Sequence, residues 1–206
     1  MRWPVVLLGN FDQAARSDPA ALRPSAVAAT RSLVWSRAQL DAPVPDAQAA
    51  RDRLAFLASR PASHREGDCL FVHGSPRNPL DEYVFPEDVY NQRKMDGIFA
   101  LVDRYCFQGH THIPGIFVED APDDLHQFYS LEEMSYAWRL DARKTICNVG
   151  SVGQPRDGDP RACYVLFDGK MIRYRRVEYD LEETARKIYA QPELDRGLGD
   201  RLREGR

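Results

Sequence analysis

The stretch CFQGHTHIPG, residues 106–115, gives the strongest indication of the fold. It begins inside a short apolar run, 105–108, which ends in a polar loop with two histidines. The same arrangement occurs in CLFVHGSP, residues 69–76, and in WPVVLLGN, residues 3–10. Runs of this kind predict buried strands, and helical segments precede two of them. Short strands that follow helices and end in polar loops predict an α/β protein.

Local patterns predict the remaining elements. Apolar residues at helical spacing predict helices over residues 26–40, 46–59 and 88–102, the second behind an Asp46 cap. Strand-like runs cover residues 116–118, 144–147, 163–167 and 171–174. Asp168-Gly169 predicts a two-residue hairpin between the last two runs, with positive φ at both positions. Asp180 and Glu183 form a capping box for a last helix, and we expect the charged tail after Gln191 to fray.

The composition is that of an ordinary globular protein. The 206 residues are 43% hydrophobic, and 28 basic against 31 acidic residues give a net charge of −3. A charge this close to neutral gives no indication of nucleic-acid binding. No apolar run approaches the roughly 18 residues of a membrane span, and no cleavage site follows the first residues, so we expect a cytoplasmic protein. The cysteines form no CxxC pair and lie in or beside apolar runs, which predicts free buried thiols at Cys69, Cys106, Cys147 and Cys163.

Three histidines follow predicted strands directly: His73, His110 and His112. The carboxyl ends of strands are where open α/β sheets bind ligands, and neutral imidazole is the commonest metal ligand. We expect His110 and His112, two residues apart in extended backbone, to project to the same side. The alternative is an ordinary loop pair. His64 and His126 lie in polar sequence and are expected on the surface.

Two further segments carry candidate groups. Asn10 follows the first predicted strand, where Gly-Asn alone is a turn motif. Arg156 lies in a glycine-rich loop, where it either contacts a phosphate or is a solvated side chain in a polar turn. Asn148 and Ser151 fit loop-shaping roles better than ligand roles.

The order strand-Gly-Asn, strand-His-Gly, strand-Gly-His-x-His resembles the calcineurin-like metallophosphoesterase superfamily, in particular its small bacterial members. The matching stretches include LGNFD (8–12), FVHGSP (71–76), CFQGHTHIPG (106–115) and CNVGSVGQPRDGDPR (147–161). The resemblance implies an α/β fold with a two-sheet β sandwich flanked by helices. It implies a metallophosphoesterase-like domain over residues 1–178, with a C-terminal helix and charged tail, 179–206, packed on it.

The same resemblance implies a site for two divalent transition-metal ions that activate a hydroxide to attack phosphorus. Carried over, Asn10, His73 and His110 hold one ion and His112 the other. An amide oxygen with imidazoles suits Mn, Fe or Zn better than Mg or Ca. The implied substrate is a phosphate mono- or diester, either a phosphorylated small molecule or a phosphoprotein.

Two departures from the family pattern bear on activity. The resemblance implies a family pattern that begins with strands ending in Asp-x-His and Gly-Asp, and neither motif precedes Asn10. We therefore expect two βα units to be missing and at most one partial metal site to be present. The family's Gly-Asn-His-Asp reads Gly-Asn-Phe-Asp, so Phe11 stands in place of the histidine. The sequence therefore contains no certain catalytic residue.

Two explanations of the departures stay open: Met1 is an internal methionine of a longer reading frame, or the chain is a truncated relative. The sequence predicts an impaired metal-dependent phosphoesterase. The alternatives are a catalytically degenerate binding or scaffold protein and a non-functional fragment. An incomplete sheet also predicts an exposed edge through which chains could associate.

Overall fold

The computed structural model describes residues 4–16, 27–120 and 125–206. The chain divides into two units, residues 1–62 with 180–203 and residues 63–179 with 204–206. The single domain expected over 1–178, with 179–206 packed on it, stays a prediction.

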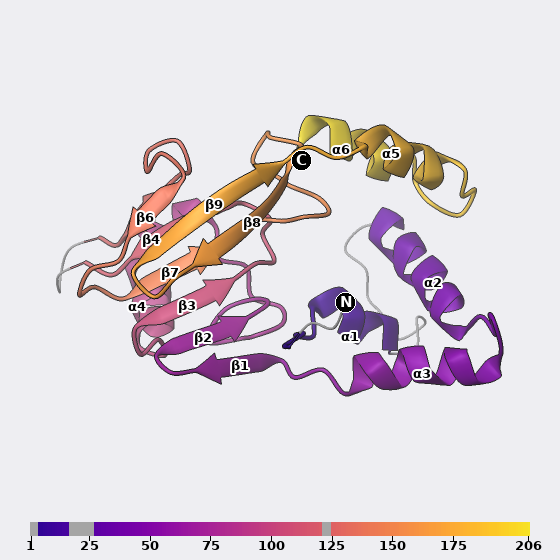
Figure 1. Ribbon diagram of the computed structural model, residues 1–206, viewed down its shortest axis with the longest axis horizontal. Helices are drawn as coiled ribbons and strands as arrows, with labels where there is room; N and C mark the ends of the chain where they lie inside the picture. Colours follow the sequence, from indigo (N-terminus) through magenta and orange to yellow (C-terminus); the bar gives the residue numbers. More distant parts are fainter. Residues whose placement is uncertain (1–3, 17–26, 121–124) are drawn as a thin grey trace. The chain divides into compact units, whose positions relative to one another are not determined.

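The second unit is built on two sheets (Figure 1). The larger has six strands in the order β1 (Ser63–Glu66), β2 (Cys69–Val72), β3 (Tyr105–Gln108), β7 (Thr145–Asn148), β4 (Gly115–Val118) and β5 (Gln127–Tyr129). β2, β3 and β7 run parallel, and the other pairings are antiparallel. The smaller sheet is antiparallel, in the order β6 (Ala137–Arg139), β9 (Met171–Val177) and β8 (Ala162–Phe167).

Apolar side chains fill both faces of the six-stranded sheet, because successive strand residues point to opposite faces. On one face, Phe107 packs in a core that includes Ile172 of the smaller sheet. On the other face, Cys106 packs in a core with Met95 and Ile98 of α4 (Gln92–Phe99). The sheet is thus covered on both sides, as the sandwich expected from the family resemblance requires.

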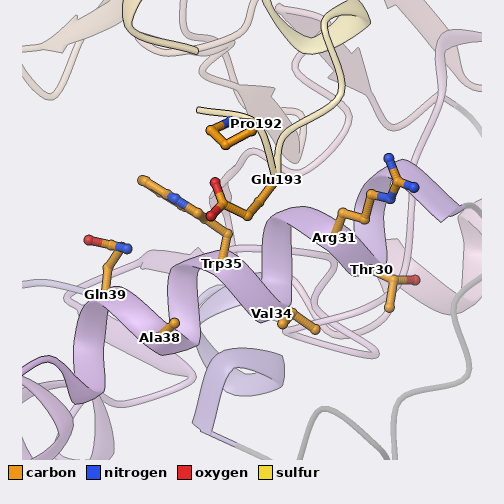
Figure 2. Close-up of a pocket in the computed structure, with 8 residues that line it drawn as sticks. All are labelled: Thr30, Arg31, Val34, Trp35, Ala38, Gln39, Pro192 and Glu193. Carbon is orange, nitrogen blue, oxygen red and sulfur yellow. The ribbon is translucent and has the colours of Figure 1, made fainter. Parts of the chain in front are cut away.

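The first unit is helical. It contains α1 (Asn10–Arg16), α2 (Val27–Asp41), α3 (Ala47–Ala58), α5 (Leu181–Tyr189) and most of α6 (Gly197–Glu204). This unit has a pocket of about 510 Å³. Figure 2 shows residues that line it, among them Val34 and Trp35 of α2 and, from another segment, Pro192 and Glu193. None of the predicted site residues lines it. In the part of the chain that the structure describes, no helix is long and apolar enough to cross a membrane.

Most predicted elements are confirmed, among them the strands that end before His73 and Gly109 and the helix capped by Asp46. The free thiols are also confirmed, although Cys69 is half-buried and the other three are fully buried. The predicted strand over residues 3–8 is wrong for its described part, residues 4–8, which is irregular. A strand needs a neighbour, and the amide of Leu8 instead donates to the Pro61 carbonyl at 2.9 Å.

Three other predictions need correction. The helix expected over 88–102 is a 3-10 helix, Pro86–Tyr90, followed by α4, because Asn91 caps α4 and interrupts the run. The tail expected to fray forms α6. In the β8–β9 hairpin, Gly169 has positive φ and Asp168 does not, so the turn expected to have positive φ at both positions is wrong. The Asp168 carboxylate instead accepts hydrogen bonds from the Lys170 and Met171 amides.

Candidate functional site

The carboxyl ends of parallel strands bring two predicted ligands to one edge of the larger sheet. β2 pairs with β3 through Phe71 and Phe107, so His73 and His110 follow the two strands at neighbouring positions. Gly109 donates its amide to the His73 carbonyl at 3.0 Å, which joins the two loops. The side chains meet: His73 Nε2 lies 2.9 Å from His110 Nδ1, and the ring centroids are 4.7 Å apart.

This separation fits two ligands of one metal ion. Two imidazole nitrogens at about 2.1 Å from an ion, at right angles to each other, lie about 3 Å apart. His110 is 5% exposed, and burial lowers its pKa, so the fold favours the neutral imidazole that a metal requires. The pair therefore suits a divalent transition-metal ion.

His110 and His112 both have a left-handed backbone conformation, with φ of 65° and 62°. The extended backbone expected for these two residues is therefore wrong. Residues other than glycine adopt this conformation rarely and at some cost in free energy, so the surrounding structure must hold them there.

Asn148, the last residue of β7, supplies part of that restraint. Its side-chain amide donates to the Gly109 carbonyl at 2.8 Å and to the Thr111 hydroxyl at 2.7 Å. Its side-chain oxygen accepts from the Gly150 amide at 3.0 Å. Asn148 is fully buried, and its amide group forms hydrogen bonds with residues of two loops. This agrees with the loop-shaping role expected for it.

The loop after β7 holds His112 from two directions. The Gln154 carbonyl accepts a hydrogen bond from His112 Nδ1 at 2.6 Å, and the Arg156 amide donates to the His112 carbonyl at 3.1 Å. The bond to the carbonyl places the proton on Nδ1 and leaves Nε2 as the nitrogen with a lone pair. Ser151 shapes this loop, since its hydroxyl accepts from the amides of Gly153 and Gln154.

Arg156 acts electrostatically on His110. Its positive charge adds to burial in lowering the pKa of His110. Its guanidinium also donates to the Gln154 side chain at 3.1 Å. A cation near the imidazole pair raises the local positive potential, which favours an anionic ligand.

The other predicted residues are in the first unit. Asn10 is the first residue of α1 rather than a loop residue, and Phe11 is 50% exposed. The structure does not place this unit against the histidines, so the role of Asn10 as a ligand stays a prediction. Among the described residues, no group of three or more His, Cys, Asp or Glu side chains is arranged to hold a metal ion.

Sequence reasoning missed the loop between His73 and α4. The Tyr83 ring stacks on His110 with centroids 3.8 Å apart, and the Asp81 carbonyl lies 3.3 Å from His110 Nε2. No local pattern marks these residues, because the contact joins positions 27 or more residues apart. The surface position expected for His126 is also wrong: it is 5% exposed and lies 2.8 Å from the Asp96 carboxylate.

No family model matches the chain. An uncharacterized protein of Methanocaldococcus jannaschii is 37% identical over 164 residues, which are 75% of this chain and 60% of that protein. The chain thus spans less than two thirds of that relative. A hypothetical protein of Pyrococcus horikoshii, 19% identical, shares the fold with a TM-score of 0.66 over 98% of this chain and 73% of its own.

The crystal structure of a metallophosphoesterase from Sphaerobacter thermophilus matches with a TM-score of 0.73 at 31% identity. The match covers 97% of this chain and 76% of that one. The two sheets with flanking helices and the histidines after parallel strands agree with this likeness. The chain therefore belongs to the metallophosphoesterases of the calcineurin-like superfamily.

Proposed function

We propose that the protein is a metal-dependent phosphoesterase that hydrolyses phosphate mono- or diesters. The observation that carries this proposal is the 2.9 Å approach of His73 Nε2 to His110 Nδ1 at the sheet edge, in a chain that belongs to the metallophosphoesterases. A divalent ion, when bound, would supply a nucleophile from water at neutral pH and stabilise charge on the phosphoryl oxygens. Mn, Fe or Zn suits the donor set.

The residues of the chain would take separate roles. His73 and His110 would hold an ion. His112 would offer Nε2 to a second ion only alongside further ligands, because Gln154 occupies its Nδ1 and one imidazole alone does not retain a metal ion. Arg156 would bind the phosphoryl group of a phosphorylated small molecule or a phosphoprotein through its charge.

The direct test is hydrolysis of p-nitrophenyl phosphate and its bis ester by the Mn²⁺-loaded chain. His110→Asn should lower the metal-dependent rate at least tenfold, since it removes a ligand nitrogen. The matched control is His64→Asn, a half-exposed histidine of β1. Absence of metal-dependent turnover, or equal rates in wild type and His110→Asn, would contradict the proposal.

A second candidate function is supported by the ligand set. Among the described residues no third ligand of the His, Cys, Asp or Glu type joins the histidine pair, and Phe11 cannot transfer a proton. A binding or scaffold protein that keeps the fold needs neither a complete metal site nor a proton donor. This candidate predicts a cooperative melt together with substoichiometric metal and no turnover above the His110→Asn level.

A further inference from the structure

The loop that follows β2 covers one side of His110 with an aromatic stack. Tyr83 lies on the imidazole with ring centroids 3.8 Å apart and an interplanar angle of 21°. Phe85 stacks on Tyr83 in turn, at 5.3 Å and 6°. Tyr83 is 40% exposed whereas His110 is 5% exposed, so the tyrosine ring is part of what shields the imidazole from water.

The same loop determines which nitrogen of His110 carries the proton. His110 Nε2 lies 3.3 Å from the Asp81 carbonyl, which can only accept a hydrogen bond. The proton is therefore on Nε2, and Nδ1 keeps the lone pair that faces His73. A metal-binding imidazole is normally oriented in this way, by a partner on its other nitrogen.

The loop is held by its own polar network. The hydroxyl of Ser75, which is fully buried, donates to the Glu82 carboxylate and accepts from the amides of Arg77 and Asn78. Glu82 also forms an ion pair with Arg77. Because Glu82 lies between Asp81 and Tyr83 in sequence, these bonds restrain the two groups that contact His110.

We propose that Tyr83 is a positioning residue. Its ring, together with the Asp81 carbonyl, holds the His110 imidazole in the rotamer and tautomer that direct Nδ1 at His73. The part of this inference that concerns an ion rests on the proposed function, whereas the orientation and tautomer of His110 do not. Tyr83→Leu should free the imidazole to rotate, while Tyr83→Phe keeps the ring and should restore the orientation.

The first measurement is the tautomer of His110 in the metal-free chain, from long-range ¹H–¹⁵N spectra of wild type and variants. Wild type and Tyr83→Phe should show His110 protonated at Nε2, and Tyr83→Leu should show a mixture of tautomers. The control is Tyr90→Leu, a 77% exposed tyrosine at the end of the 3-10 helix that follows this loop. Unchanged His110 nitrogen shifts in Tyr83→Leu would overturn the proposal. Tyr83→Met replaces Tyr83→Leu if the latter does not fold.

The second measurement is Mn²⁺ affinity at fixed pH. Loss of a residue that orients a ligand typically weakens metal binding roughly 10- to 100-fold, so this loss is expected for Tyr83→Leu and not for Tyr83→Phe or Tyr90→Leu. If wild type binds no Mn²⁺, the proposed function fails and the spectra still decide the role of Tyr83. If Mn²⁺ binds wild type and Tyr83→Leu equally, the positioning role fails alone.

Discussion

Asn148 is the residue that joins the loops of the site through a single side chain. It is fully buried and bonds to Gly109, Thr111 and Gly150. Each buried polar group left without a partner costs about 1–3 kcal/mol, so Asn148→Ala should lower the free energy of unfolding by about 2–4 kcal/mol. Urea denaturation measures this, with Asn91→Ala at the α4 cap as a control expected to cost about 1 kcal/mol. A loss under 0.5 kcal/mol for Asn148→Ala would show that the loops do not depend on it.

Phe11 gives a second prediction at the residue scale. A general acid typically contributes about 10²- to 10⁴-fold to a rate, and a phenyl ring cannot donate a proton. If the family histidine assisted the leaving group, Phe11→His should raise hydrolysis of esters with poor leaving groups, such as alkyl phosphates, at least tenfold. Esters of p-nitrophenol should change little, because p-nitrophenolate leaves without protonation. An equal change for both substrate kinds would contradict the role assigned to this position.

At the scale of elements, the β8–β9 hairpin shows how a side chain replaces an expected turn. Hydrogen bonds from Arg173 and from the Lys170 and Met171 amides lower the pKa of Asp168 to about 2. A carboxyl whose pKa is lowered in the fold stabilises it above its ordinary pKa of 3.8, and this contribution is lost as the pH falls toward 2. Arg173→Leu should move the Asp168 pKa back toward 3.8, measured by NMR titration of the carboxyl carbons. An unchanged pKa would show that the backbone amides alone lower it.

Elements that depend on local pattern could be predicted from the sequence, and elements that depend on distant partners could not. The strands before His73 and Gly109 follow from short apolar runs with loop residues after them. The irregular residues 4–8 have the same pattern, but a strand also needs a neighbour to pair with. β1 was missed because its four residues, SHRE, have no apolar run.

The candidate site shows the same division at the scale of the whole molecule. The family resemblance implied that His73 and His110 hold one ion. The structure brings their side chains together at one edge of the sheet, where parallel strands end, and the role of the pair as metal ligands stays a prediction. The contacts of Tyr83 and Asp81 with His110 could not be predicted, since they come from a loop whose path is set by the Ser75–Glu82–Arg77 network. The position of Asn10 relative to the histidines stays a prediction.

Retention of a divalent ion by the histidine pair is the most direct test. Equilibrium dialysis against Mn²⁺, with the bound metal measured by mass spectrometry, should show binding by wild type and His64→Asn. His73→Asn and His110→Asn should each bind at least tenfold more weakly, because each removes one of two nitrogens 2.9 Å apart. Equal binding by all four proteins, or no binding by wild type, would contradict a metal centre at this sheet edge.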